Sequence, residues 1–158
     1  MRKSSLCLAL MLFWPIVVQA SPKAEIFGGY QYTHLQDGTS RNGWTGALTG
    51  NIGSLLGITA DFSGVYGYGL NFYTYTFGPE IHAHLPVVKP YAHALFGGAR
   101  LSASSFSAHA FAMYMGGGVD AGRGMIAWRV VQVDWLFTDF SSWTTHNFRY
   151  STGLVFRF

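Results

Sequence analysis

The sequence has little cysteine and little charge. Cys7 is the single cysteine of the 158 residues, and charged residues make up only 11%. Cys7 lies early in the apolar part of an N-terminal leader, so it does not mark a lipoprotein attachment site. A chain without this leader has neither disulfides nor thiolate metal ligands, which excludes a small exported domain stabilised by cross-links.

Long apolar runs are also missing after residue 20. A membrane-spanning helix needs roughly 20 consecutive apolar residues, and the sequence beyond the leader offers no such run. A helical membrane protein is therefore excluded. The charge balance also gives no reason to expect a nucleic-acid partner, because without Arg2 and Lys3 eight basic residues oppose seven acidic ones.

The leader itself has the pattern of a secretory signal peptide. Arg2 and Lys3 form a positive start, Leu6–Val18 an apolar core, and Val18-Gln19-Ala20 a small-residue cleavage pattern. The alternative is a membrane anchor, but the apolar run is short and Pro15 interrupts it. We expect a signal peptide over residues 1–20, cleaved after Ala20, and one domain over residues 21–158.

The mature sequence is rich in glycine and aromatic residues, and its apolar residues alternate. In Asn147–Phe158 the even positions carry mostly large apolar side chains and the odd positions mostly polar or small ones. The same period of two recurs, with a weaker pattern in the last three, in Glu25–Thr33, Trp44–Ile52, Leu56–Ser63, Tyr73–His82, Pro90–Arg100, His109–Asp120 and Met125–Thr138. Keeping Arg129 in phase with Gln132 and Asp134 requires a β-bulge near Val130–Val131.

This pattern predicts an all-β fold, an eight-stranded antiparallel up-and-down transmembrane β-barrel. A soluble lipocalin-like or streptavidin-like barrel would instead place its apolar face inward. Aromatic girdles are expected at both rims, from Tyr30, Tyr32, Trp44, Tyr73 and Tyr75 at one and Trp128, Phe156 and Phe158 at the other. Short periplasmic turns are expected at Gly53–Leu55, Leu85–Lys89 and Ala121–Gly124, and external loops at Leu35–Gly43, Val65–Leu70, Leu101–Ala108 and Asp139–His146.

The final strand resembles the C-terminal recognition strand of bacterial outer-membrane barrels, which ends in Phe with apolar residues at alternate positions. This resemblance implies that the barrel-assembly machinery is a partner and that Tyr150, Leu154, Phe156 and Phe158 form the assembly signal. The whole mature chain is similar to OmpA/OmpX-type barrels. The segment Arg129–Trp135, with Asn147-Phe148-Arg149 after it, resembles the last hairpin of the "outer membrane protein beta-barrel domain" family. The resemblance implies a monomer in the outer membrane, in contact with lipid and lipopolysaccharide.

The strand phases place a group of charged residues on the inward face. These are Glu25, Asp61, Glu80, Arg129, Asp134, Arg149 and Arg157. We expect Glu25 to pair with Arg157 across the barrel seam, and Asp134 could pair with Arg149 across the last hairpin. The charges could line a gated ion path, but an eight-stranded barrel is just wide enough for its own side chains to fill it. A salt-bridged plug is therefore the favoured interpretation.

Two other kinds of site deserve a test. Glu80, His82, His84 and His93 could gather as a zinc site near one rim. Asp139, Ser141, Ser142 and His146 supply the residue types of a Ser-His-Asp relay, as in enzymes that modify lipid A, but their order and spacing match no deacylase motif. We predict no catalytic, metal or cofactor site and a non-enzymatic structural or surface-interaction role. The alternatives are a narrow porin-like channel for ions or small solutes and a lipid A-modifying enzyme.

Overall fold

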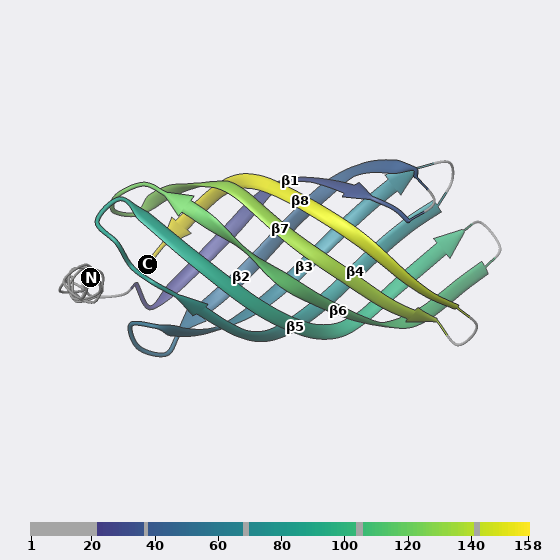
Figure 1. The fold of residues 1–158 in the computed structure, drawn as a ribbon, viewed down its shortest axis with the longest axis horizontal. Helices are drawn as coiled ribbons and strands as arrows, with labels where there is room; N and C mark the ends of the chain where they lie inside the picture. The colour runs from purple at the N-terminus through teal and green to yellow at the C-terminus, as the bar shows by residue number, and fades with distance from the viewer. Residues whose placement is uncertain (1–21, 37, 68–69, 104–105, 141–142) are drawn as a thin grey trace, which may run out of the picture.

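The described part of the chain is a closed barrel of antiparallel strands. A computed structural model describes residues 22–36, 38–67, 70–103, 106–140 and 143–158. The strands are β1 (Ala24–His34), β2 (Ser40–Asn51), β3 (Leu56–Gly67), β4 (Leu70–His82), β5 (Val88–Ala103), β6 (Phe106–Ala121), β7 (Ile126–Phe140) and β8 (Trp143–Arg157). Each pairs with the next, and β8 returns to β1 (Figure 1). The predicted all-β, eight-stranded up-and-down topology is confirmed.

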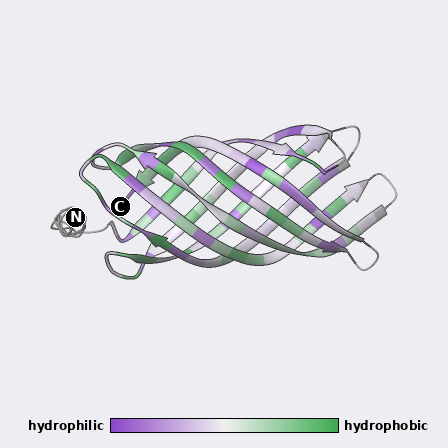
Figure 2. Cartoon of the chain, viewed as in Figure 1, coloured by the Kyte–Doolittle hydropathy of each residue, from purple (hydrophilic) through white to green (hydrophobic). Residues whose placement is uncertain are grey.

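Side chains alternate between the lumen and the outer surface, and the large apolar ones face outward. Phe77 is 67% exposed, whereas its neighbour Thr76 is only 3% exposed. Apolar positions are accordingly interspersed with polar ones along the strands in Figure 2. The outer surface carries, among others, Ile26, Leu48, Ile58, Phe62, Phe77, Ile81, Phe96, Met115, Leu154 and Phe156. A soluble barrel would show the reverse arrangement, so that alternative is wrong.

The seam between β1 and β8 depends on two glycines. Gly29 and Gly153 are register partners, and a Cβ atom on either one would overlap backbone atoms of the opposite strand. The absence of a side chain lets the two strands approach closely. Only glycine can therefore occupy these two positions without displacing the seam.

The expected irregularity in β7 is present. The pairing of β7 with β8 shifts register between Arg129 and Gln132, and its pairing with β6 shifts opposite Val119/Asp120. Val130 and Val131 consequently both face outward, while Arg129 and Gln132 are both buried in the lumen. The bulge near Val130–Val131 is confirmed, and it keeps two polar side chains on the same inner face.

The connections at the end opposite the termini are much shorter than predicted. Strand pairing continues as far as Gly67 with Leu70 and Ala103 with Phe106, so most of the two expected loops at 65–70 and 101–108 is strand. Likewise, β2 begins at Ser40, β7 extends to Phe140 and β8 begins at Trp143. These segments are rich in Ser, Gly and Ala, which suggested loops, but ladder hydrogen bonds formed around the barrel outweigh those weak preferences.

The predicted girdle residues lie on the outer surface. Tyr30, Tyr32, Trp44 and Tyr75 are exposed at positions nearer the end opposite the termini, called the far end below. Trp128, Phe156 and Phe158 are exposed near the termini. Tyr73 is half-buried, and its ring makes an edge contact with Tyr66. The predicted leader, residues 1–20, lies outside the described residues. The described residues form no helix long and apolar enough to cross a membrane.

Candidate functional site: the charged lumen

Arg149 lies at the centre of the lumen and holds two carboxylates. From β8 it donates from Nη1 and Nη2 to the two oxygens of Asp61 on β3, at 2.8 and 3.1 Å. Its Nε donates to Asp134 Oδ2 on β7 at 2.8 Å, and its guanidinium stacks 4.0 Å from the Tyr114 ring. All these side chains are fully buried. A planar donor fork matched to two carboxylates is a geometry that arginine provides and lysine does not.

A second arginine is held closer to the termini. Arg129 on β7 donates from Nε and Nη2 to the two carboxylate oxygens of Asp120, at 2.8 and 3.2 Å. Its guanidinium lies 4.1 Å from the Phe27 ring and 4.4 Å from the Tyr91 ring. The two rings cover the cation where it is not hydrogen-bonded.

A lysine completes the charged part of the lumen. The Lys89 ammonium lies 2.7 Å from Glu25 Oε2 and 3.3 Å from Glu80 Oε1, and its side chain is only 2% exposed. Glu80 also accepts a hydrogen bond from Thr59 at 2.9 Å. Burying two carboxylates beside one ammonium is tolerable only because hydrogen bonds satisfy the remaining oxygens.

Polar side chains join the ion pairs of Arg149 and of Arg129 into one network. The Gln132 amide donates to Asp134 at 2.6 Å and accepts hydrogen bonds from Arg129 and from the Tyr91 hydroxyl, both at 2.8 Å. His93 Nε2 lies 2.8 Å from the other oxygen of Asp134. The network therefore runs from Asp61 on β3 through Arg149 to Asp120 on β6, across strands that are not neighbours in the sheet.

The half of the lumen farther from the termini contains an apolar cluster among buried polar side chains such as Thr45, Thr74 and Thr138. Leu95, Ala99, Ala112 and Leu136 pack with the Tyr114 ring in one buried cluster. The cluster lies next to Arg149, because Tyr114 contacts both. Charged, polar and apolar side chains of the described residues are thus all buried inside the barrel.

All seven charged residues that the strand phases placed inward do lie in the lumen. The side chains of six of them are 4% exposed or less, and Arg157 is 11% exposed. Asp134 and Arg149 are in contact, but the expected pairing of Glu25 with Arg157 is wrong. The two are register partners at the seam, yet Glu25 binds Lys89, and Arg157 approaches Asp120 at 3.9 Å.

Sequence reasoning missed Lys89, Asp120, Tyr91 and Tyr114, and it placed Gln132 inward without assigning it a partner. The sequence pattern predicts a turn at Lys89 and a strand from Pro90, but β5 begins at Val88. One more residue of alternation would have placed Lys89 on the same face as Tyr91 and His93. Asp120 has the same parity in β6 as the buried Ala112 and would have been found in the same way.

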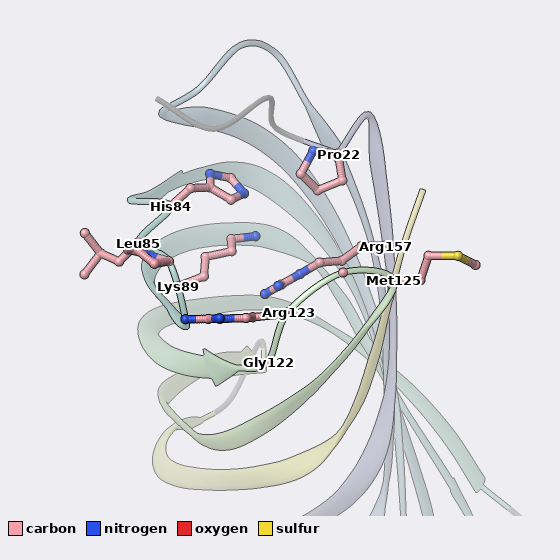
Figure 3. Close-up of a pocket in the computed structure, with 10 residues that line it drawn as sticks. Pro22, His84, Leu85, Lys89, Gly122, Arg123, Met125 and Arg157 are labelled. Atoms are coloured by element: carbon pink, nitrogen blue, oxygen red, sulfur yellow. The ribbon is translucent and has the colours of Figure 1, made fainter. Parts of the chain in front are cut away.

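The end of the lumen near the termini opens into a pocket. It has a volume of about 570 Å³. Lys89, Arg123 and Arg157 are the charged residues in its lining, and His84 lies beside them (Figure 3). Lys89 forms the boundary between this pocket and the buried network, because its ammonium is bound to Glu25 and Glu80.

The two other candidate sites are not assembled by the described residues. Among these residues, no group of three or more His, Cys, Asp or Glu side chains is placed to hold a metal ion. His93 binds Asp134 rather than joining His82 and His84. Of the suggested relay, the His146 ring stacks on Trp135 and Asp139 accepts a hydrogen bond from Thr144. Ser141 and Ser142 lie outside the described residues.

Comparison with known proteins shows what the barrel is similar to. No protein-family model and no curated protein matches the sequence. Among solved structures, Ail, the attachment invasion locus protein of Yersinia pestis, is 15% identical with a TM-score of 0.55, covering 86% of this chain and 99% of Ail. The N-terminal β-barrel domain of Pseudomonas aeruginosa OprF is 9% identical with a TM-score of 0.62, covering 87% and 98%. This is the fold of the small outer-membrane barrels.

A third small outer-membrane barrel supports the same assignment. Neisserial surface protein A is 13% identical with a TM-score of 0.55, and the match covers 85% of this chain and 96% of that protein. The matches span almost the whole length of each neighbour, so the outer-membrane barrel fold accounts for all eight strands. At these identities the likeness concerns the fold alone, and it agrees with the OmpA/OmpX-type architecture expected from the sequence.

Proposed function

We propose that the protein is an integral outer-membrane barrel with a non-enzymatic role, either structural or in surface interaction. The observation that carries the proposal is the combination of an apolar outer surface with a lumen crossed by a buried ion-pair network. The first requires a lipid surrounding. The second blocks passage through the interior, so partners would bind at the ends of the barrel.

The outer surface has the chemistry of a lipid-facing wall. Leu48, Phe62, Phe77 and Ile81 come from three neighbouring strands and are each at least half exposed. Water-soluble monomers rarely expose contiguous apolar patches larger than a few hundred Å². Barrel closure pairs the backbone groups of the described strands, which hydrocarbon demands of any spanning segment.

The filled lumen argues against the channel alternative. A permeating ion would have to separate Arg149 from Asp61 and Asp134, which are all fully buried, and then pass the apolar cluster around Leu95. Breaking a buried ion pair costs about 3–5 kcal/mol. We expect purified protein to give no steady conductance in planar bilayers, and steady single-channel currents that change in Arg149→Ala would contradict the plug.

The far end of the barrel offers a surface for interaction. Tyr75 and Phe111 are exposed aromatic residues in one register row across β4, β5 and β6. The next outward-facing row toward the far end contains Tyr73, Arg100 and His109. Strand pairing continues for about three residues beyond this row, at about 3.3 Å per residue. A polar rim therefore extends beyond the apolar wall. Its position opposite the termini makes it external if the short turns face the periplasm, as in other barrels of this kind.

Membrane integration can be tested with a pair of arginine substitutions. Phe77→Arg places a charge in the middle of the apolar wall and should lower the free energy of unfolding by about 2–4 kcal/mol in lipid. Ser107→Arg, on the polar rim, should have little effect. The measurement is urea unfolding in bilayers, together with fractionation and the faster gel migration of the unheated barrel. Equal stability of the two variants, or recovery in the soluble periplasmic fraction, would contradict the proposal.

A further inference from the structure

The pocket at the end of the barrel near the termini gathers positive charge from three separate parts of the chain. Lys89 projects from β5, Arg123 from the turn between β6 and β7, and Arg157 from the end of β8 (Figure 3). None of the described residues that line the pocket carries a carboxylate side chain. Glu25 and Glu80 lie behind Lys89 and are bound to it.

Arg157 has hydrogen-bonding capacity that the described residues do not use. Its Nε and Nη2 atoms are buried, and neither has a hydrogen-bond partner within the described part of the chain. The nearest carboxylate oxygen, Oδ2 of Asp120, is 3.9 Å from Nη2, and that carboxylate is already held by both donors of Arg129. A buried guanidinium with unused donors costs free energy unless an acceptor reaches it.

The charge of the surroundings defines the kind of acceptor. At this end of the lumen Glu25, Glu80 and Asp120 balance Lys89, Arg129 and Arg157. Arg123 is additional, and it is exposed on the pocket rim. The pocket is therefore net positive and has unused planar N–H donors, which suit the oxygens of a phosphate group.

We propose that this pocket is a binding site for a small phosphate-bearing molecule, held by Arg157 and Arg123 with Lys89 at its base. The volume of about 570 Å³ exceeds a bare phosphate and lies within the usual range for small-molecule sites. The buried network closes the inner end of the pocket, so the ligand is retained at the mouth and does not pass through the barrel. This proposal is independent of the outer-end role, because it concerns the opposite end of the molecule.

The test uses the full mature barrel in a maltoside detergent, which contains no phosphate. Inorganic phosphate, glycerol 3-phosphate and citrate are titrated at constant ionic strength while backbone amide resonances are followed. We expect saturable shifts at Gly122, Arg123 and Gly124 with the two phosphates, and weaker ones with citrate. Short-chain phosphatidylglycerol is added as a separate arm. Tighter binding of this lipid than of glycerol 3-phosphate would assign the site to a headgroup, and equal or weaker binding to a soluble phosphate.

Two matched arginine substitutions make the test specific. Arg123 lies in an exposed turn, so Arg123→Gln should fold, and we expect it to weaken phosphate binding about fivefold or more. Arg100→Gln removes the same charge from the far rim and should leave the affinity unchanged. Shifts that sodium chloride reproduces, equal weakening in both variants, or binding of citrate alone would overturn the proposal.

Discussion

Arg149 on β8 reaches across the lumen to Asp61 on β3 and binds both of its carboxylate oxygens. The two residues are 88 positions apart in sequence and belong to strands that are not paired. Their contact spans the barrel interior, so it links two strands that no hairpin joins. Asp134 shares the same guanidinium from a third strand.

Removal of this guanidinium should strongly destabilise the barrel. Arg149→Met leaves Asp61 and Asp134 buried without a cation, and we expect a loss of about 3–5 kcal/mol in the free energy of unfolding. Arg149→Lys keeps the charge but loses the planar pair of donors. Its free energy of unfolding should lie between those of Arg149→Met and the wild type. Urea titration in bilayers, followed by tryptophan fluorescence, gives both values. A loss below about 1 kcal/mol for Arg149→Met would mean that the pair adds little stability.

A side chain at the glycine seam should prevent closure. Gly153→Val places a branched side chain against the backbone of β1, and overpacking that cannot relax costs about 3 kcal/mol or more. Gly50→Val is the matched control, because a Cβ at Gly50 meets no atom within 4 Å. The unheated gel mobility of the two variants compares them directly. A closed, fast-migrating Gly153→Val barrel would contradict this account of the seam.

The terminal aromatic should affect assembly more than stability. We propose that Tyr150, Leu154, Phe156 and Phe158 are recognised by the barrel-assembly machinery, and the three of these that lie within β8 face outward. Phe158→Ala should lower the amount of folded barrel in outer membranes several-fold, while the protein refolded in detergent keeps its stability. Phe148→Ala, which truncates another exposed aromatic of the same strand, should assemble normally. If both variants lost the same amount of folded barrel in cells, the loss would reflect exposed apolar area in general and would contradict a specific terminal signal.

His84 should make the end of the barrel near the termini sensitive to acid. Burial lowers the pKa of His84, and the neighbouring His82 and Lys89 lower it further, against a smaller opposing effect of the Ser54 carbonyl and Glu25. Its folded pKa is below its unfolded value of about 6.5, so stability present above that pH is lost as the pH falls toward the folded pKa. The measurement is the temperature at which the fast-migrating folded band on a gel is replaced by the unfolded band. Between about pH 7.5 and pH 5, this temperature should fall less in His84→Gln than in the wild type. An identical fall in both would show that other groups dominate.

The periodicity of the sequence predicts one part of this structure well and another part poorly. Alternation assigns each side chain to a face, which is why Arg149 and Asp61 were both placed in the lumen. It does not show which inward residues meet, because that depends on strand tilt and stagger around the closed barrel. The expected Glu25 to Arg157 pair was derived from sheet neighbours alone, whereas Lys89 reaches Glu25 from the other side of the lumen.

The positively charged pocket could not be predicted from the sequence either. Lys89, Arg123 and Arg157 are separated by more than 30 residues each. They come together only because the start of β5, the turn between β6 and β7 and the end of β8 lie at the same rim. The outer strand ends were missed for another reason. Small and hydroxyl residues such as Ser102 and Ser107 have weak preferences, and only their register across β5 and β6 identifies them as strand.

The pairing of β1 with β8 has a consequence for how the barrel forms. Partners such as Glu25 and Arg157 are separated by almost the entire described chain. Bringing them together therefore has the largest entropic cost of loop closure of any strand pairing in the sheet. The other strand pairs are hairpins, which form locally and early. Until the last pairing is made, β1 and β8 are both open edges able to capture other strands. A factor that shields one of these edges would therefore act before the pairing with the highest loop-closure cost.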